Sequence, residues 1–283
     1  MVLESLTNPF KAQDKPLYLF LIGALYATAG LFLGNWIFRE YASLIMVFLT
    51  VMACIPLLYN TFHAEEEKEV ILDEEKEILK QHGRILIFLL FLFLGIVAAF
   101  VLWYVVLPSS WIQNSFHSQT LTIQSISTRI ATGGFSNINT FTIILLNNLK
   151  VLIFCILFSF LYGAGAIFIL TWNASVIATA IGNYIRTNIT SLTTQLGLFK
   201  YAAYFKIISI GLLKYFVHGI PEIAAYFIGG IAGGIISVAV IRESFSTRNF
   251  EKIILDSSNL IIISIIILIV AAFIEVYITP ALF

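Results

Sequence analysis

The stretch LYLFLIGALYATAGLFLGNWIF, Leu17 to Phe38, runs for 22 residues without a charge. A helix rises about 1.5 Å per residue, so roughly 20 apolar residues cross about 30 Å of hydrocarbon. Two more uncharged runs of this length follow, Tyr41–Phe62 and Ile85–Leu107. Apolar residues occupy every face of these runs, as in membrane-spanning helices and unlike the alternating strands of a barrel. The three runs therefore predict an integral membrane protein.

The composition supports this class. The chain has 283 residues, of which 59% are hydrophobic and 11% charged, against about 25% charged in soluble domains. Its net charge is zero, so no basic surface indicates nucleic-acid binding. We expect one all-α domain in the lipid bilayer, a polytopic transmembrane helical bundle of six or seven spans. Cys54 and Cys155 lie in candidate spans, where they most often serve as small apolar residues.

The N-terminal part, 1–107, contains the three runs and a charged segment at 63–84, HAEEEKEVILDEEKEILKQHGR. Its apolar residues recur at a spacing of seven, which predicts a cytoplasmic amphipathic helix. One interpretation is a solvated helical extension of the flanking spans. The alternative is a docking surface for a soluble partner protein.

Residues 108–140 are rich in Ser, Thr, Asn and Gln and carry one charge, Arg129. TLTIQSI, Thr120 to Ile126, alternates like a short strand, and Gly133-Gly134 indicates a turn. We therefore predict a compact extracytoplasmic loop that caps the bundle, since basic residues concentrate in cytoplasmic loops.

The C-terminal part, 141–283, is expected to be a helical bundle. With the N-terminus in the cytoplasm, nine of the sixteen Lys and Arg residues face the cytoplasm of a cell-membrane protein. This count requires an even number of crossings before Arg242, so Asn173–Ile185 should cross. Its thirteen residues extend only about 20 Å as a helix, which leaves a broken or re-entrant helix as an alternative. The four apolar segments are Phe141–Trp172, Asn173–Ile185, Ile207–Ile241 and Leu260–Leu282.

Polar residues in this part are costly in lipid and should face partners in the bundle. Pro221 lacks an N–H, which predicts that one helix ends near His218 and another begins near Gly219. Glu222 would then lie in the first turn of the new helix, where the helix dipole favours a carboxylate. Small residues four apart predict close helix packing further on. The expected intramembrane polar residues are Asn147, Asn148, Asn173, His218 and Glu222, with Glu275 in the last span, and the packing glycines are Gly229, Gly230, Gly233 and Gly234.

Three hypotheses stand for His218 and Glu222. They can belong to a satisfied polar network with the asparagines, to a transport or proton-relay site, or to a metal or hydrolytic site. The last is the weakest, because a catalytic zinc normally has three protein ligands and no HExxH, GxSxG or P-loop motif is present. We expect no catalytic residue, no metal and no cofactor.

Three motifs carry a resemblance to a known family: LLNNLKVLIF, FLYGAGAIFILTWNASVIATAIG and HGIPEIAAYFIGGIAGGIISVAVI. Together, over about 141–241, they resemble the stage II sporulation protein M family of polytopic membrane proteins. The resemblance implies that Asn147, Asn148, Asn173, His218 and Glu222 are the family's characteristic polar positions.

In spore formers the family's namesake resembles a scaffold that holds peptidoglycan-degrading partners, and other members occur in prokaryotes that do not sporulate. The first hypothesis is therefore a non-enzymatic scaffold that recruits envelope or soluble proteins through the acidic helix or the outer loop. The second is a small permease or channel lined by Asn173, His218 and Glu222. A homo-oligomer is compatible with either.

Overall fold

The computed structural model describes residues 16–69, 75–132, 137–162, 166–190, 198–241 and 248–282. The N-terminal part consists of α3 (Pro16–Ile37), a short turn of 3₁₀-helix η1 (Arg39–Tyr41), α4 (Ala42–Glu69) and α5 (Glu75–Val106). Helix α3 packs against both α4 and α5. The three long uncharged runs are thus helices, and the all-α fold class is confirmed.

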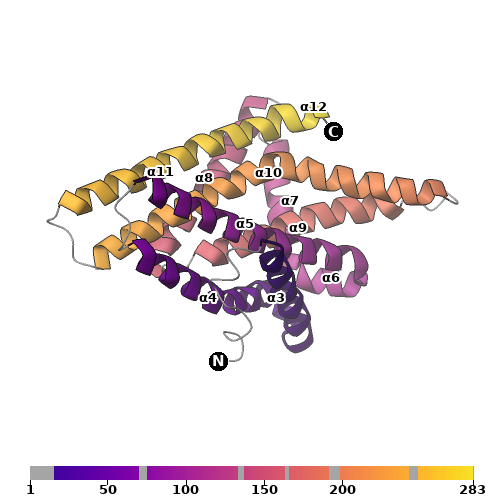
Figure 1. The fold of residues 1–283 in the computed structure, drawn as a ribbon. Coiled ribbons are helices and arrows are strands. Elements are labelled where there is room, and N and C mark those ends of the chain that lie inside the picture. Colours follow the sequence, from indigo (N-terminus) through magenta and orange to yellow (C-terminus); the bar gives the residue numbers. More distant parts are fainter. Residues whose placement is uncertain are drawn as a thin grey trace.

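The C-terminal part begins with α8 (Asn137–Tyr162) and α9 (Ala166–Thr190). Next come α10 (Leu198–Ile241) and α11 (Arg248–Phe273), which continues into a turn of π-helix, η2 (Ile274–Ile278), and into α12 (Thr279–Leu282). Helices α10 and α11 run side by side in opposite directions (Figure 1). Helix α9 packs on both α5 and α10 and so joins the two parts of the chain.

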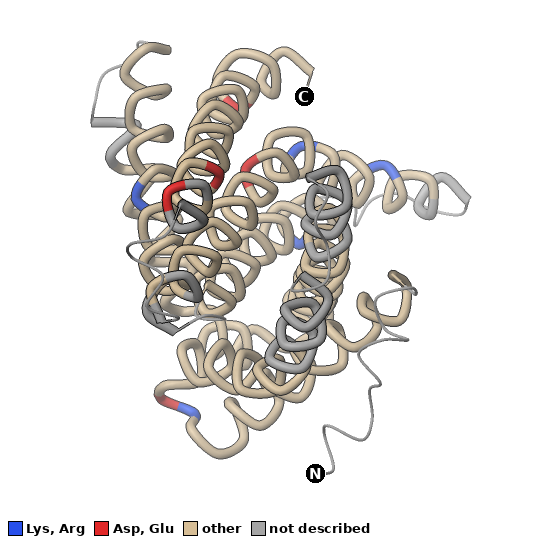
Figure 2. The backbone as a smooth tube through the Cα atoms, turned by 60° about the vertical axis from the view of Figure 1, so that its left-hand side comes forward, with Lys and Arg blue, Asp and Glu red and all other residues tan. Residues whose placement is uncertain are grey.

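Seven of the described helices are long and apolar enough to cross a membrane. They are the helices that span Pro16–Ile37, Arg39–Leu57, Leu86–Val106, Asn137–Phe160, Ala166–Ile189, Ala202–Ser237 and Ile253–Leu282. Charged residues are sparse along the described backbone, as a membrane bundle requires (Figure 2). The protein is therefore a multi-pass membrane protein, with the larger of the two expected numbers of spans.

The expected boundary near Asn173 is wrong. Asn173 lies inside α9, a continuous helix of 25 residues, so the segment is not a short or re-entrant helix. The boundary lies earlier, because α8 ends at Tyr162 and α9 begins at Ala166. The Gly-Ala-Gly sequence between them lies outside the described residues, and the prediction had included it in one apolar run. A single Asn does not end a helix that packs along its length, whereas Gly is a poor helix former.

The expected helix break at Gly219 and Pro221 is also wrong, because α10 continues through Pro221 for 44 residues. An interior proline removes one backbone hydrogen bond and costs about 3 kcal/mol. Prolines are nevertheless tolerated in membrane helices, where neighbouring groups satisfy the freed carbonyl. Here α10 packs against α8, α9 and α11, and this burial outweighs the local cost.

The expected strand at Thr120–Ile126 is wrong as well. Residues 109–132 form two helices, α6 (Ser109–Ser115) and α7 (His117–Thr132), here called the cap. The Thr120 and Thr122 hydroxyls donate to the carbonyls of Phe116 and Ser118, each at 2.9 Å and four residues back along the chain. A helix satisfies its own backbone groups, whereas a single strand needs a partner strand.

The charged segment at 63–84 is divided between the end of α4, which reaches Glu69, and the start of α5 at Glu75. Residues 70–74 lie outside the described residues. Whether the segment is a solvated extension of the flanking spans or a docking surface stays a prediction.

The orientation of the bundle yields a testable prediction. Six candidate spans precede position 242, which is the even number that the basic-residue count requires. In a variant whose buried Cys54 and Cys155 are replaced by alanine, we expect a cysteine at exposed Ser127 to react with a membrane-impermeant maleimide from outside. A cysteine at exposed Glu251 should react from the cytoplasmic side only. The opposite pattern would invert the topology.

Candidate functional site

A polar cluster forms where α10 meets the last helix. The Thr279 hydroxyl lies 3.4 Å from Nδ1 of His218. The helices α10 and α11 are antiparallel (Figure 1). One turn on from His218 along α10 therefore lies beside one turn back from Thr279 along the last helix. This register places Glu222 opposite Glu275. The two carboxyls interact electrostatically, although Glu275 was predicted only as a polar residue of the last span.

Glu222 has one well-defined hydrogen bond. The Tyr226 hydroxyl, one turn along α10, donates to Oε1 of Glu222 at 2.7 Å. Tyr226 is fully buried and lies near both Glu275 and Cys155 of α8. The tyrosine therefore fixes one carboxylate oxygen and leaves the other free for a different partner.

Asn148 of α8 reaches the same carboxyl. Its side chain is only 4% exposed and interacts with Glu222, yet its Nδ2 is outside hydrogen-bonding geometry of any acceptor. Neighbouring Asn147 is turned about 100° around α8, is half-buried, and lies on a different face of the helix. Of the predicted asparagine pair, Asn148 is thus the one that belongs to the cluster.

Asn173 of α9 lies at the same level along the bundle as Glu222. A Cβ atom on Gly211 would lie 3.0 Å from Tyr184, and one on Gly230 would lie 3.2 Å from the Cβ of Ala166. Between these two contacts the antiparallel register of α9 and α10 places Asn173 level with Glu222. Nδ2 of Asn173 is also buried without a hydrogen-bond partner.

The glycines of α10 hold α8 close enough for this arrangement. A Cβ atom on Gly233 would lie 2.5 Å from the Ile156 carbonyl oxygen, and one on Gly229 would collide with Leu152. Gly230 faces Ala166 and Ser159, whereas a Cβ on Gly234 would meet nothing within 4 Å. Leu152 and Ile156 lie one and two turns beyond Asn148 on α8, so this packing fixes the position of Asn148 beside Glu222.

The cationic neighbours of the cluster are directed elsewhere. Nζ of Lys214 lies 5.6 Å from the centre of the Tyr184 ring, a cation–π contact, and its charge acts on His218 rather than on Glu222. Lys150 is exposed. Across the described residues, no three His, Cys, Asp or Glu side chains come together as metal ligands. The cluster is best described as two acidic side chains with neutral polar neighbours.

A second site lies at the cap and was not predicted. Arg186 of α9 donates from Nη1 to the Leu107 carbonyl at 2.8 Å and to the Tyr104 carbonyl at 3.3 Å. Its Nη2 donates to the Ser109 hydroxyl at 3.0 Å. Arginine near the last carbonyls of a helix is favourable for both hydrogen bonding and the helix dipole. Arg186 therefore ties the end of α5 and the start of the cap to α9.

Two amides tie the cap to the other spans. Asn35 of α3 donates from Nδ2 to the Ser115 hydroxyl at 2.8 Å. Gln119 of α7 donates from Nε2 to the Ser43 carbonyl at 3.0 Å and to the Ser175 hydroxyl at 3.1 Å. The Ser43 and Ser118 hydroxyls also lie 2.8 Å apart. Hydrogen bonds thus connect the cap to α3, α4 and α9.

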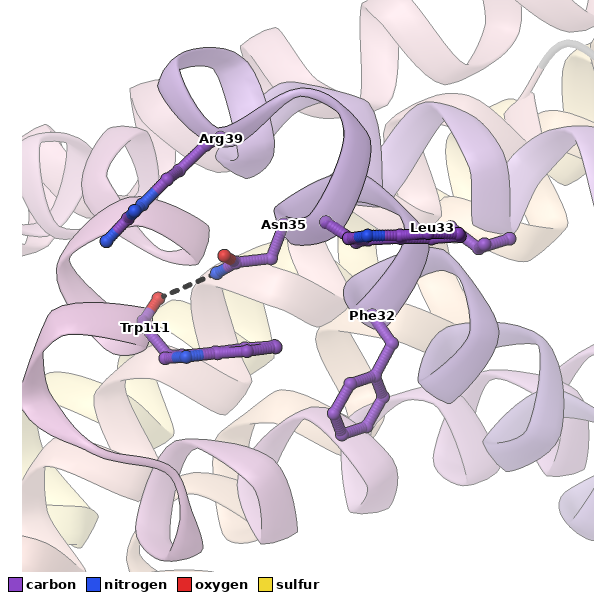
Figure 3. A pocket seen from close by; sticks show the side chains of 6 residues that line it. Phe32, Leu33, Asn35, Arg39 and Trp111 are labelled. Carbon is purple, nitrogen blue, oxygen red and sulfur yellow. Dashed lines mark hydrogen bonds between the residues drawn. The ribbon is translucent and has the colours of Figure 1, made fainter.

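A pocket of about 490 Å³ opens between the end of α3 and α6. Asn35 lies between Arg39 and Trp111 and donates to the Trp111 carbonyl at 3.4 Å (Figure 3). Tryptophans at the end of an apolar run are typical of the membrane–water interface, and this signal could have drawn attention to Trp36 and Trp111. The lining residues are Phe32, Leu33, Asn35, Trp36, Arg39 and Trp111.

The family model described as stage II sporulation protein M matches residues 85–280. The chain belongs to the stage II sporulation protein M family. The match extends beyond the resemblance at 141–241 to include α5 from residue 85 onward, the cap and Glu275. A relative from Methanocaldococcus jannaschii, named Uncharacterized protein MJ0793, is 34% identical over 143 residues, which cover 50% of this chain and 71% of the relative. No solved structure matches the chain.

Proposed function

We propose that this family member is a non-enzymatic scaffold that holds partner proteins at the cell envelope through its cap. It lies in the cytoplasmic membrane with its N-terminus in the cytoplasm and the cap outside. The observation that carries the proposal is the set of hydrogen bonds from Asn35, Gln119 and Arg186 that connects the cap to three spans. A surface held in one position costs less conformational entropy when a partner binds.

The accessible face of the cap suits a protein partner. Leu121 is 51% exposed and is surrounded along the two helices by uncharged polar residues. Protein–protein interfaces are depleted in charged residues at their centre and are polar at their rim. The exposed residues of this face include Gln113, His117, Leu121, Gln124 and Ser127. The acidic segment on the other side offers a second contact for a soluble protein.

Cross-linking in native membranes, followed by mass spectrometry, tests the proposal with two matched variants. One variant places arginine at Gln113, Gln124 and Ser127 of the cap, and the other replaces Glu65, Glu66, Glu67 and Glu69 with lysine. We expect the cap variant to lose the cross-linked partners that the parent retains, with unchanged abundance, because exposed substitutions contribute little to stability. The acidic-segment variant should keep them. Identical partners in the parent and the cap variant would contradict the proposed docking surface.

A permease for a small solute or ion is the second candidate, and the opposition of Glu222 and Glu275 inside the bundle favours it. Ionisable residues inside membrane bundles often mark transport pathways. Reconstituted vesicles distinguish the two functions, because a scaffold should produce no flux of ions or small solutes above that of empty vesicles. Flux that Glu222→Gln abolishes would favour the permease.

A further inference from the structure

We propose that Glu222 and Glu275 form a proton-binding pair that holds one proton between its two carboxyls inside the bundle. This property goes beyond scaffolding and does not require it. Uptake of one aqueous proton forms an O–H bond on one carboxylate and changes the charge of the pair from −2 to −1. The protonated carboxyl can then donate to the ionised one.

The first argument is the opposition of two acids in a place where both cannot easily be ionised. The His218–Thr279 contact sets the register that brings them together, and the carboxyls act on one another electrostatically. Both side chains are half-buried. Two carboxylates that share such a site repel each other and lose hydration, so one of them retains a proton.

The second argument is Asn148, a neutral neighbour of the pair. This amide is 4% exposed and is a hydrogen-bond partner of the Glu222 carboxyl, although its Nδ2 lies outside strict hydrogen-bonding geometry. A buried donor without an acceptor costs about 1–3 kcal/mol. An ionised Glu222 supplies one, because a carboxylate accepts several hydrogen bonds and Tyr226 occupies only Oε1. Asn148 is thus positioned to stabilise the form in which the proton lies on Glu275.

Neither Lys214 nor Arg186 is placed to neutralise one of the two carboxylates instead of the proton. Lys214 is eight residues from Glu222, about 12 Å along the helix, and lies over the Tyr184 ring. Arg186 is bound to the end of α5. The titratable groups around the pair are Tyr215, His218 and Tyr226 from α10 and Cys155 from α8, while Lys214 of α10 acts on His218 and lies over the Tyr184 ring of α9.

The backbone around Glu275 supports a functional role. Glu275 lies in η2, the one π-helical turn among the described residues, and π-helical turns within α-helices occur frequently at functional sites.

Infrared spectroscopy of the purified full chain in lipid vesicles tests the proposal directly, because protonated carboxyls have a C=O stretch that carboxylates lack. At pH 7, where exposed glutamates are ionised, we expect a carboxylic-acid band in the parent protein. The band should vanish in the Glu222→Gln/Glu275→Gln double variant. It should persist in the control variant Glu251→Gln, which changes an exposed acid at the start of α11.

Three results would overturn the proposal. The first is the absence of a carboxylic-acid band in the parent protein at pH 7, which excludes a retained proton. This result needs only the parent protein and holds even if the variants fail to fold. The second is a band that the folded double variant retains, because another acid would then hold the proton.

The spectra are recorded in choline chloride and in sodium chloride. A band that disappears only in sodium would assign the pair to a metal cation and would also overturn the proposal.

Discussion

Gly233→Ala is expected to lower the melting temperature of the purified protein, although it adds a single methyl group. The new Cβ would lie 2.5 Å from the Ile156 carbonyl oxygen and 3.1 Å from its Cα. The obstacle is backbone, so α8 and α10 must move apart. Overpacking of this kind costs about 1–3 kcal/mol. At about 2–4 °C per kcal/mol for a chain of this size, the melting temperature should fall by roughly 2–12 °C.

Gly234→Ala is the matched control, one position further along the same helix. A Cβ there meets nothing within 4 Å, and alanine is the better helix former by about 1 kcal/mol. We expect an unchanged or slightly raised melting temperature, measured by thermal unfolding in the same detergent. Equal losses in the two variants would show that the effect comes from the helix itself and not from its contact with α8.

This pair of glycines shows how far a sequence pattern can predict packing. Spacing of small residues selected Gly229, Gly230, Gly233 and Gly234 together, but it does not specify which side of α10 faces α8. The structure turns Gly229 and Gly233 toward α8 and leaves Gly234 in open space. Periodicity therefore predicts that helices approach, and only the position of the partner helix identifies the residues at the contact.

The spans themselves could be predicted, because an uncharged run long enough to cross hydrocarbon has few alternatives. The errors came from local rules applied without tertiary packing. Pro221 predicted a break that the contacts of α10 prevent, and the alternation at Thr120–Ile126 predicted a strand where α7 forms. A local preference of a few kcal/mol decides the structure only where burial does not oppose it.

The sequence predicted which polar residues lie inside the bundle, but it did not predict which of them contact one another. Glu222 and Glu275 are 53 positions apart, and their opposition depends on the antiparallel register that the His218–Thr279 contact reveals. Glu275 was noted in the sequence, but nothing there specifies its partner. The same holds for Arg186, whose acceptors are carbonyls of α5. Backbone acceptors carry no residue-type signal, so this contact is invisible in the sequence.

Arg186→Met should have the second large effect, because it removes three hydrogen-bond donations while keeping much of the apolar stem. The Leu107 and Tyr104 carbonyls lose a charged donor near the end of α5, and the Ser109 hydroxyl loses its link to α9. Hydrogen bonds to charged groups contribute about 1.5–3 kcal/mol, and a cation at a helix C-terminus adds to this. We expect a lower melting temperature and faster amide hydrogen exchange in the cap at 109–116.

Two further variants separate the parts of the interaction. Ser109→Ala removes only the hydroxyl contact and should leave the melting temperature almost unchanged, since both carbonyls keep their donor. Arg186→Lys keeps the charge but lacks the planar fork that reaches two carbonyls and a hydroxyl, so it should fall between the parent and Arg186→Met. Hydrogen exchange measured by mass spectrometry should rank the cap's protection in the same order. If the cap amides exchange as slowly in Arg186→Met as in the parent protein, Asn35 and Gln119 hold the cap in place without the arginine.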